Sequence, residues 1–123
     1  MNHIEEILTA AVARDIHFKV EGEKVIAIPA NAVTPDLLVG LRKIKPDLLK
    51  VYAQCVIACH GLSVSPETVF ASLTPFDISV IVSGEIGADG MRAYSESLDT
   101  GIRSRRVLLN ERGQVTTHFN FAN

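Results

Sequence analysis

The chain lacks the cysteine content, the net charge and the long apolar runs that mark several common classes of protein. Only two of its 123 residues are cysteines, too few for the disulfide framework of a small secreted scaffold. The formal net charge is −2, so no chain-wide positive field attracts nucleic acid or an anionic membrane.

Membrane and export signals are also missing from the sequence. The strongly apolar runs, such as D-I-S-V-I-V-S, are far shorter than the roughly 20 residues that span a bilayer. The N-terminal M-N-H-I-E-E-I-L has neither the basic nor the apolar region of a signal peptide. We therefore expect a protein of the cytoplasm that has no membrane partner.

What is present is the composition of a folded domain. Hydrophobic residues make up 47% of the chain and charged residues 21%, which is typical of globular proteins rather than disordered ones. A chain of this length can bury one core, as a single domain or as two small halves that share it.

The first part of the chain predicts a helix followed by a β-hairpin. Apolar residues recur at helical spacing over residues 3–14, and Asn2 with Glu5 has the spacing of a capping box. The strict alternation in I-H-F-K-V and the apolar V-I-A-I flank E-G-E-K, which predicts a hairpin over residues 16–28. A loop centred on Gly22 and Glu23 pairs Val20 with Val25.

The rest of the chain shows a series of helix start signals. These are Thr34-Pro35-Asp36, Pro46-Asp47, Ser65-Pro66-Glu67 and Thr74-Pro75 with Asp77. The second of them predicts a separate helix over residues 46–60. Over residues 76–83 the β-branched I-S-V-I-V leaves a strand as the alternative, although the strong start signal favours a helix ended by Gly84. Met91, Tyr94, Leu98 and Ile102 mark a last helix, and R-R-V-L-L-N-E-R-G-Q-V-T-T-H-F predicts a C-terminal hairpin.

These elements predict an α+β, mostly helical fold. Residues 1–61 form an αββαα module, and residues 62–123 form a helical extension with a terminal hairpin that packs on the 46–60 helix. No polar residue interrupts the stretch from Cys55 to Cys59, so we expect this part of the helix to be buried on more than one side.

The stretch C-V-I-A-C-H-G, residues 55–61, is the one place that looks like a reactive site. Structural zinc sites use a full tetrahedral set of ligands, often supplied as C-x2-C pairs, whereas this spacing is C-x3-C without a second pair. The cysteines are better interpreted as small apolar side chains of a core stripe, with His60 at the negative helix end and Gly61 in the left-handed conformation. We expect no metal site.

Signals of catalysis are absent from the sequence. It contains no nucleophile elbow, no Walker A loop, no H-E-x-x-H motif and no dinucleotide-binding fingerprint. Its carboxylates are spread over helix starts and solvent faces. We therefore expect no catalytic residue, no cofactor and no enzymatic activity.

Two surfaces are candidates for binding a partner. One face of the hairpin combines Ile26 and Ile28 with His17, Lys19 and Lys24, an apolar strip edged by positive charge that suits an acidic, amphipathic peptide. A loop or the C-terminal half covering both isoleucines is the alternative. The second candidate is a cluster of arginines that would contact phosphates of a nucleic acid, namely Arg103, Arg105 and Arg106.

The order of elements and two motifs resemble a known family. I-H-F-K-V-E-G-E-K-V-I-A-I followed by A-V-T-P-D-L-L-V-G-L-R-K-I-K-P-D-L-L-K-V-Y is similar to the TubC-type N-terminal docking domains of nonribosomal peptide synthetases. The similarity covers roughly residues 3–58. It implies a homodimer whose hairpin, through residues 17–20 and 24–28, receives a short peptide of a partner protein.

The part of the chain after that module resembles a different group of proteins. T-P-F-D-I and R-A-Y-S-E-S-L-D-T-G-I-R-S are similar to segments of small accessory proteins of bacterial mobile elements. The main hypothesis is a non-catalytic docking protein that binds another protein or peptide. The alternative is a mobile-element factor that binds nucleic acid or inhibits a host defence complex.

Overall fold

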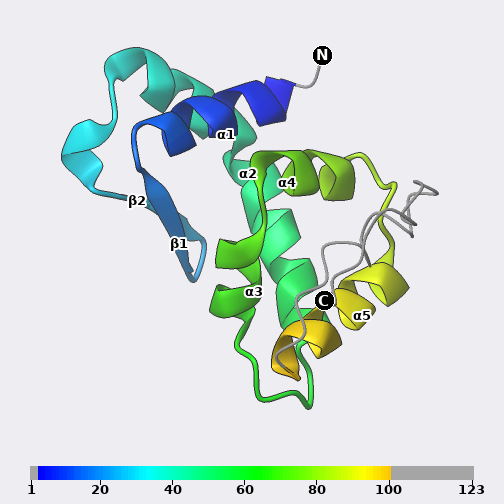
Figure 1. Ribbon diagram of the computed structural model, residues 1–123. Helices are drawn as coiled ribbons and strands as arrows, with labels where there is room; N and C mark the ends of the chain where they lie inside the picture. The colour runs from blue at the N-terminus through cyan, green and yellow to red at the C-terminus, as the bar shows by residue number, and fades with distance from the viewer. Residues whose placement is uncertain (1–2, 101–123) are drawn as a thin grey trace.

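A computed structural model describes residues 3–100 of the chain, and it confirms the mostly helical α+β class (Figure 1). The elements are α1 (His3–Ala13), β1 (His17–Glu21), β2 (Lys24–Ile28), a 3-10 turn η1 (Ala30–Ala32), α2 (Pro35–Ala58), α3 (Pro66–Ser72), α4 (Pro75–Val82) and α5 (Ala88–Asp99). The predicted C-terminal hairpin lies outside the described residues and is not confirmed, and the same holds for the place of Ile102 and the cap at Asn2.

The hairpin has the predicted register. Val20 pairs with Val25 and Glu21 with Lys24, which leaves a two-residue loop in which Gly22 has φ +64°. This left-handed conformation is one that glycine adopts without steric cost, as tight hairpin turns require. Ile16 and Val20 are buried on the inner side, whereas His17 and Lys19 are exposed on the outer side.

Helix α2 corrects the prediction of two separate helices. It runs without a break from Pro35 to Ala58, with Pro46 in its interior. Thr34 caps its start as predicted, because its side chain accepts a hydrogen bond of 3.2 Å from the backbone N–H of Leu37. The start signal at Pro46 was therefore misleading.

The reason for this continuity is the pattern of buried residues along α2. They follow one helical stripe whose phase does not change at the proline: Leu37, Ile44, Leu48, Val51, Cys55 and Ala58. An interior proline removes one backbone hydrogen bond and crowds the preceding turn, at a cost of about 3 kcal/mol. Burial of Ile44 and Leu48, one on each side of Pro46, offsets that cost through tertiary packing.

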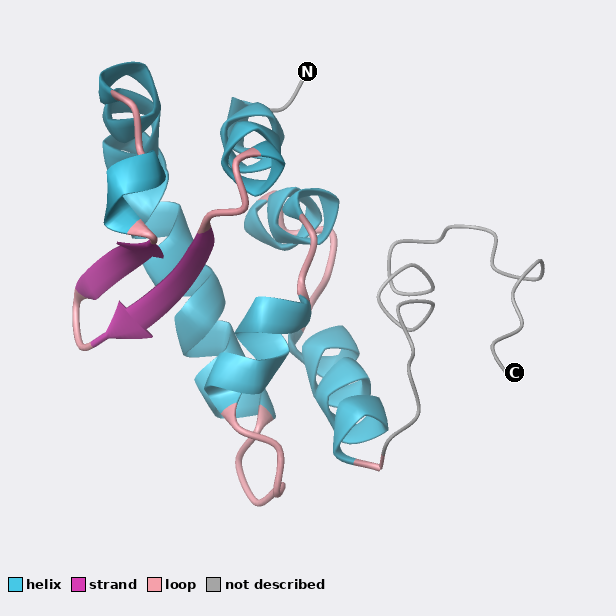
Figure 2. Cartoon of the chain, turned by 60° about the vertical axis from the view of Figure 1, so that its left-hand side comes forward, coloured by secondary structure: helices cyan, strands magenta, loops and turns pink. Residues whose placement is uncertain are grey.

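The other elements are arranged around α2. The hairpin and α5 lie on different sides of this helix, α3 packs against both α2 and β1, and α4 lies beside α1 (Figures 1 and 2). One core combines residues from both halves of the chain, such as Leu8 and Val20 with Val69 and Met91. The two halves also contact each other directly, α1 with α4 and β1 with α3.

The apolar stretch at the end of α2 is buried on one side only, which corrects a second prediction. Cys55 and Cys59 point into the core, but Val56 is 47% exposed and Ile57 is 69% exposed. Within the described residues, α3 and α5 cover the cysteine side and leave the opposite side to solvent. The absence of polar residues in this stretch therefore did not indicate burial all round.

Helices α3 and α4 begin as predicted. Ser65 caps α3, and Thr74 forms a capping box with Asp77 at the start of α4. Residues 75–82 are helical, so the strand alternative is wrong, and Gly84 ends this segment at φ +87°.

The C-terminal end of α2 is closed by a residue of α5. Gly61 adopts the predicted left-handed conformation at φ +81°. The guanidinium of Arg92 donates hydrogen bonds to the carbonyl oxygens of Ala58, at 3.0 Å, and of His60. A cation bound at these carbonyls also complements the negative end of the helix dipole, a role that the sequence had suggested for His60.

Replacing Pro46 by Ala is expected to raise the free energy of unfolding by about 1–3 kcal/mol, because it restores an N–H donor in the interior of α2. Urea denaturation measures the change, and Lys43→Ala, another exposed position of the same helix, serves as the control. A Pro46→Ala variant less stable than the wild type would contradict the description of α2 as one continuous helix.

Candidate functional site

The cysteine motif forms part of the core. Cys55 is completely buried and Cys59 is 6% exposed, and both thiols are free. Burial, with a smaller effect of the neighbouring Cys59, raises the pKa of Cys55 to about 12. Since the thiolate is the form that attacks disulfides and binds metals, this thiol is inert in the folded protein.

The surroundings of Cys59 also keep its thiol protonated. Burial raises the pKa of Cys59, although a hydrogen bond with Ser95 and the charge of Arg92 oppose this. Across residues 3–100, no group of three or more His, Cys, Asp or Glu side chains is placed to hold a metal ion. The two thiols are apolar packing groups on the side of α2 that contacts α3 and α5.

The five partner-binding residues predicted from the sequence share the outer face of the hairpin. His17 lies opposite Ile28, and Lys19 lies opposite Ile26. Ile28 is 47% exposed and Ile26 is partly buried, so the described residues do not cover this face completely. Lys24 begins the second strand of the same face.

One of the predicted cations is already paired. The Lys19 ammonium forms an ion pair of 2.9 Å with Glu21, and this contact raises the pKa of Lys19. Both side chains are more than half exposed, so the pair contributes little to stability. The pair also places the carboxylate of Glu21 beside one of the cations predicted to bind a partner.

A deeper feature lies on the other side of β2, where the hairpin faces the first half of α2. A groove of about 540 Å³ runs between them. Phe18 and residues 25–27, which include the predicted partner-binding Ile26, form its hairpin wall. Leu38, Leu41 and Leu48 form its helix wall. Leu38 is 39% exposed, so the groove presents apolar surface to solvent.

The rim of this groove is positively charged. Arg42 and Lys45 line it, and no acidic residue does. The prediction from the sequence did not include either cation, because it considered only the outer face of the hairpin and the C-terminal arginines. The signal that points to them is their helical spacing from Leu38 and Leu41, which places all four along one side of α2.

The free edge of β2 runs along the same groove. In a hairpin with a two-residue loop, the pair next to the loop, Glu21 with Lys24, is hydrogen-bonded, and such pairs alternate with non-hydrogen-bonded ones. Val25 and Ala27 belong to the non-hydrogen-bonded pairs, so their N–H and C=O groups point to the open edge. In the described part of the chain the sheet has no third strand, and β1 packs against α3.

Comparison with known proteins gives no match: no protein-family model, no curated protein and no solved structure is significantly similar to this chain. None of the helices described for residues 3–100 is long and apolar enough to cross a membrane. The predicted nucleic-acid contacts Arg103, Arg105 and Arg106 lie outside the described residues. Within residues 3–100, the groove and the adjoining edge of β2 form the candidate binding site.

The thiol of Cys55 is expected to resist modification in the folded protein. In a Cys59→Ser variant at pH 8, a chromogenic aromatic disulfide should react with Cys55 at least about a hundredfold faster in urea than in buffer, because folding suppresses the thiolate. Cys55→Ser, which leaves Cys59, is the matched variant. Equal rates in urea and in buffer would contradict the burial described for Cys55.

Stability is expected to fall in alkaline solution. The pKa values of Cys55 and Tyr52 are both raised to about 12 by burial first, from reference values of 9.0 and 10.0. The folded protein therefore favours the protonated form of each group, and this contribution to stability is complete below the reference pKa. It is lost as the pH rises from the reference value toward 12. Urea midpoints across this range measure the loss, which should be shallower in Tyr52→Phe. An unchanged midpoint would contradict these pKa shifts.

Proposed function

We propose that this protein is a non-catalytic binding protein of the cytoplasm, which captures an extended, acidic and amphipathic segment of another protein along β2. One observation carries the proposal. Val25 and Ala27 direct their backbone groups to the open edge of the sheet, and their side chains line the groove beneath it.

A segment that pairs with this edge would use both features at once. Its backbone would satisfy the N–H and C=O groups of β2, as in other cases of β-strand addition. Its side chains would alternate between the two faces of the enlarged sheet, so every second one would enter the groove. The space of about 540 Å³ is enough for several apolar side chains.

The charges around the site favour an acidic partner. Arg42 and Lys45 line the groove and Lys24 stands at the start of β2, all of them exposed. Charges at the rim of an interface mainly speed association and orient the partner, and the apolar core of the contact supplies most of the affinity. The outer-face residues Ile26 and Ile28 extend the same edge.

The resemblance to TubC-type docking domains supports the same kind of partner, and a homodimer is part of this proposal on that ground. The resemblance of the later segment to mobile-element proteins remains an expectation, as does the alternative of a nucleic-acid-binding or inhibitory factor. No observation within residues 3–100 favours that alternative. Free, buried thiols suit the reducing cytoplasm.

A peptide of about eight residues that alternates Leu and Glu tests the proposal, with fluorescence anisotropy as the measurement. Arg42→Glu/Lys45→Glu is expected to weaken binding by about tenfold or more, because it reverses the charge of the groove rim. Lys19→Glu/Lys24→Glu changes the charge of the outer face by the same amount. Its effect should be smaller, since Lys19 is paired with Glu21.

Two further peptides test the mode of binding. A peptide of equal composition with its leucines in one block should bind more weakly, because alternation is what places apolar side chains in the groove. Methylation of alternate backbone nitrogens should also weaken binding by removing the donors of the added strand. Undiminished binding by the Arg42→Glu/Lys45→Glu variant, or by the methylated peptide, would refute strand addition at β2.

A further inference from the structure

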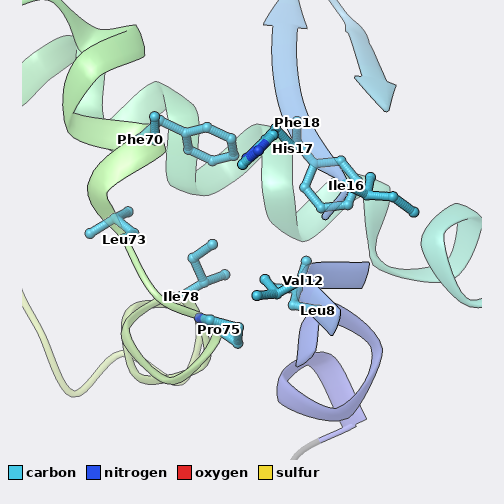
Figure 3. A pocket seen from close by; sticks show the side chains of 10 residues that line it. Leu8, Val12, Ile16, His17, Phe18, Phe70, Leu73, Pro75 and Ile78 are labelled. Atoms are coloured by element: carbon cyan, nitrogen blue, oxygen red, sulfur yellow. The ribbon is translucent and has the colours of Figure 1, made fainter. Parts of the chain in front are cut away.

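A separate cavity borders the other strand of the hairpin. It has a volume of about 110 Å³ and lies where α1, β1, α3 and the start of α4 meet (Figure 3). In this view Leu8 and Val12 of α1 lie on one side, with Ile78 and Pro75 of α4 opposite them. The groove proposed above borders β2, so the two sites lie at opposite edges of the hairpin.

The walls of the cavity are apolar and held in place. Leu8, Leu73 and Ile78 are buried. The ring of Phe70 packs edge-on against Tyr52 at 5.7 Å, and the Tyr52 hydroxyl donates a hydrogen bond of 2.8 Å to Glu67. A space of this shape therefore exists before anything binds, and a ligand need not pay to form it.

Its lining has a single polar side chain, His17, and no Asp, Glu, Lys or Arg. A charged group that entered would lose its hydration without meeting an opposite charge, which is strongly unfavourable. His17 is exposed at the edge of the cavity. When the apolar part of a ligand occupies the cavity, the imidazole can form a hydrogen bond with the ligand's polar part.

The mouth of the cavity is surrounded by exposed apolar surface. Of the residues that line it, Val12 is 55% exposed and Ala71 is exposed. Apolar side chains gathered around an open cavity are typical of a contact surface for another protein.

We infer that this cavity receives one uncharged, branched aliphatic side chain, a leucine or isoleucine, from a partner protein. The cavity, at about 110 Å³, is too small for a larger ligand. Pockets for small molecules usually measure about 300–1,000 Å³, and a cavity of about 150 Å³ holds one benzene. The exposed rim would contact the partner residues on either side of the inserted side chain. His17 would form a hydrogen bond with the backbone of those residues. This inference does not rest on the groove at β2.

The probe for this site is N-acetyl-L-leucinamide, which carries the side chain and its two flanking peptide groups. In methyl NMR spectra, millimolar probe is expected to shift the signals of Leu8, Leu73 and Ile78, which line the cavity and not the groove. N-acetyl-L-lysinamide and N-acetyl-L-alaninamide should leave these signals in place, the first because of its charge and the second because of its size.

A matched pair of variants locates the binding. Val12→Asp places a carboxylate at the mouth and is expected to weaken the probe's affinity by about tenfold or more. Val39→Asp makes the same change at a position of nearly equal exposure, 56%, that lines neither site, and should leave the affinity unchanged. Ala71→Phe, which fills the cavity from its rim, should abolish the shifts, whereas Ala53→Phe on the exposed face of α2 should not.

Three results would overturn the inference. The first is the absence of methyl shifts with N-acetyl-L-leucinamide in the wild-type protein. The second is an equal loss of affinity in Val12→Asp and Val39→Asp. The third is binding of 3-methylbutan-1-ol without binding of the leucinamide, which would identify a small free molecule instead of a side chain. Arg42→Glu/Lys45→Glu separates the two sites, because it should impair the groove and leave these shifts unchanged.

Discussion

The apolar stripe along α2 is the contact on which the other elements depend. It begins at Leu37 beside α1, continues through Ile44 and Leu48 under the hairpin, and ends at Cys55 between α3 and α5. Because the residues on both sides of Pro46 keep the same helical phase, α1, β2, α3, α4 and α5 all contact this one helix. A break at the proline would have turned half of this stripe away from its partners.

The two proposed binding sites follow from how the hairpin sits on this helix. A two-stranded sheet is too narrow to cover the helices beside it, so space is left at each of its edges. At the β2 edge that space is the groove with its cationic rim, and at the β1 edge it is the smaller apolar cavity. Phe18 lines both, so its ring forms part of the wall between them.

The two sites differ in the chemistry they offer, and this difference comes from the residues around each. The groove joins backbone groups that point to the open edge of β2 with apolar walls and with Arg42 and Lys45, which suits an extended acidic segment. The cavity has no charged lining and a single imidazole, which suits one uncharged side chain. A partner that contacts both edges of the hairpin would bind with higher affinity than a partner that makes either contact alone, because the second contact forms within the same complex.

Much of the local structure could be predicted from the sequence because it depends on neighbours in the chain. The hairpin register follows from alternation around Gly22, and the starts of α3 and α4 follow from Ser65 and Thr74 with their prolines. Each such signal needs only residues within a few positions, which the sequence displays directly. The outer-face residues of the hairpin were placed correctly for the same reason.

The sequence by itself therefore determined the register of the hairpin and the starts of α2, α3 and α4 with their caps. Only the tertiary structure decided that α2 continues through Pro46, that Val56 and Ile57 face outward, and that Arg42 and Lys45 border a groove. These features depend on which surfaces far apart in the chain meet, and packing energy then overrides local preference. A helical pattern shows which side is apolar, but the partner elements determine how much of that side they cover.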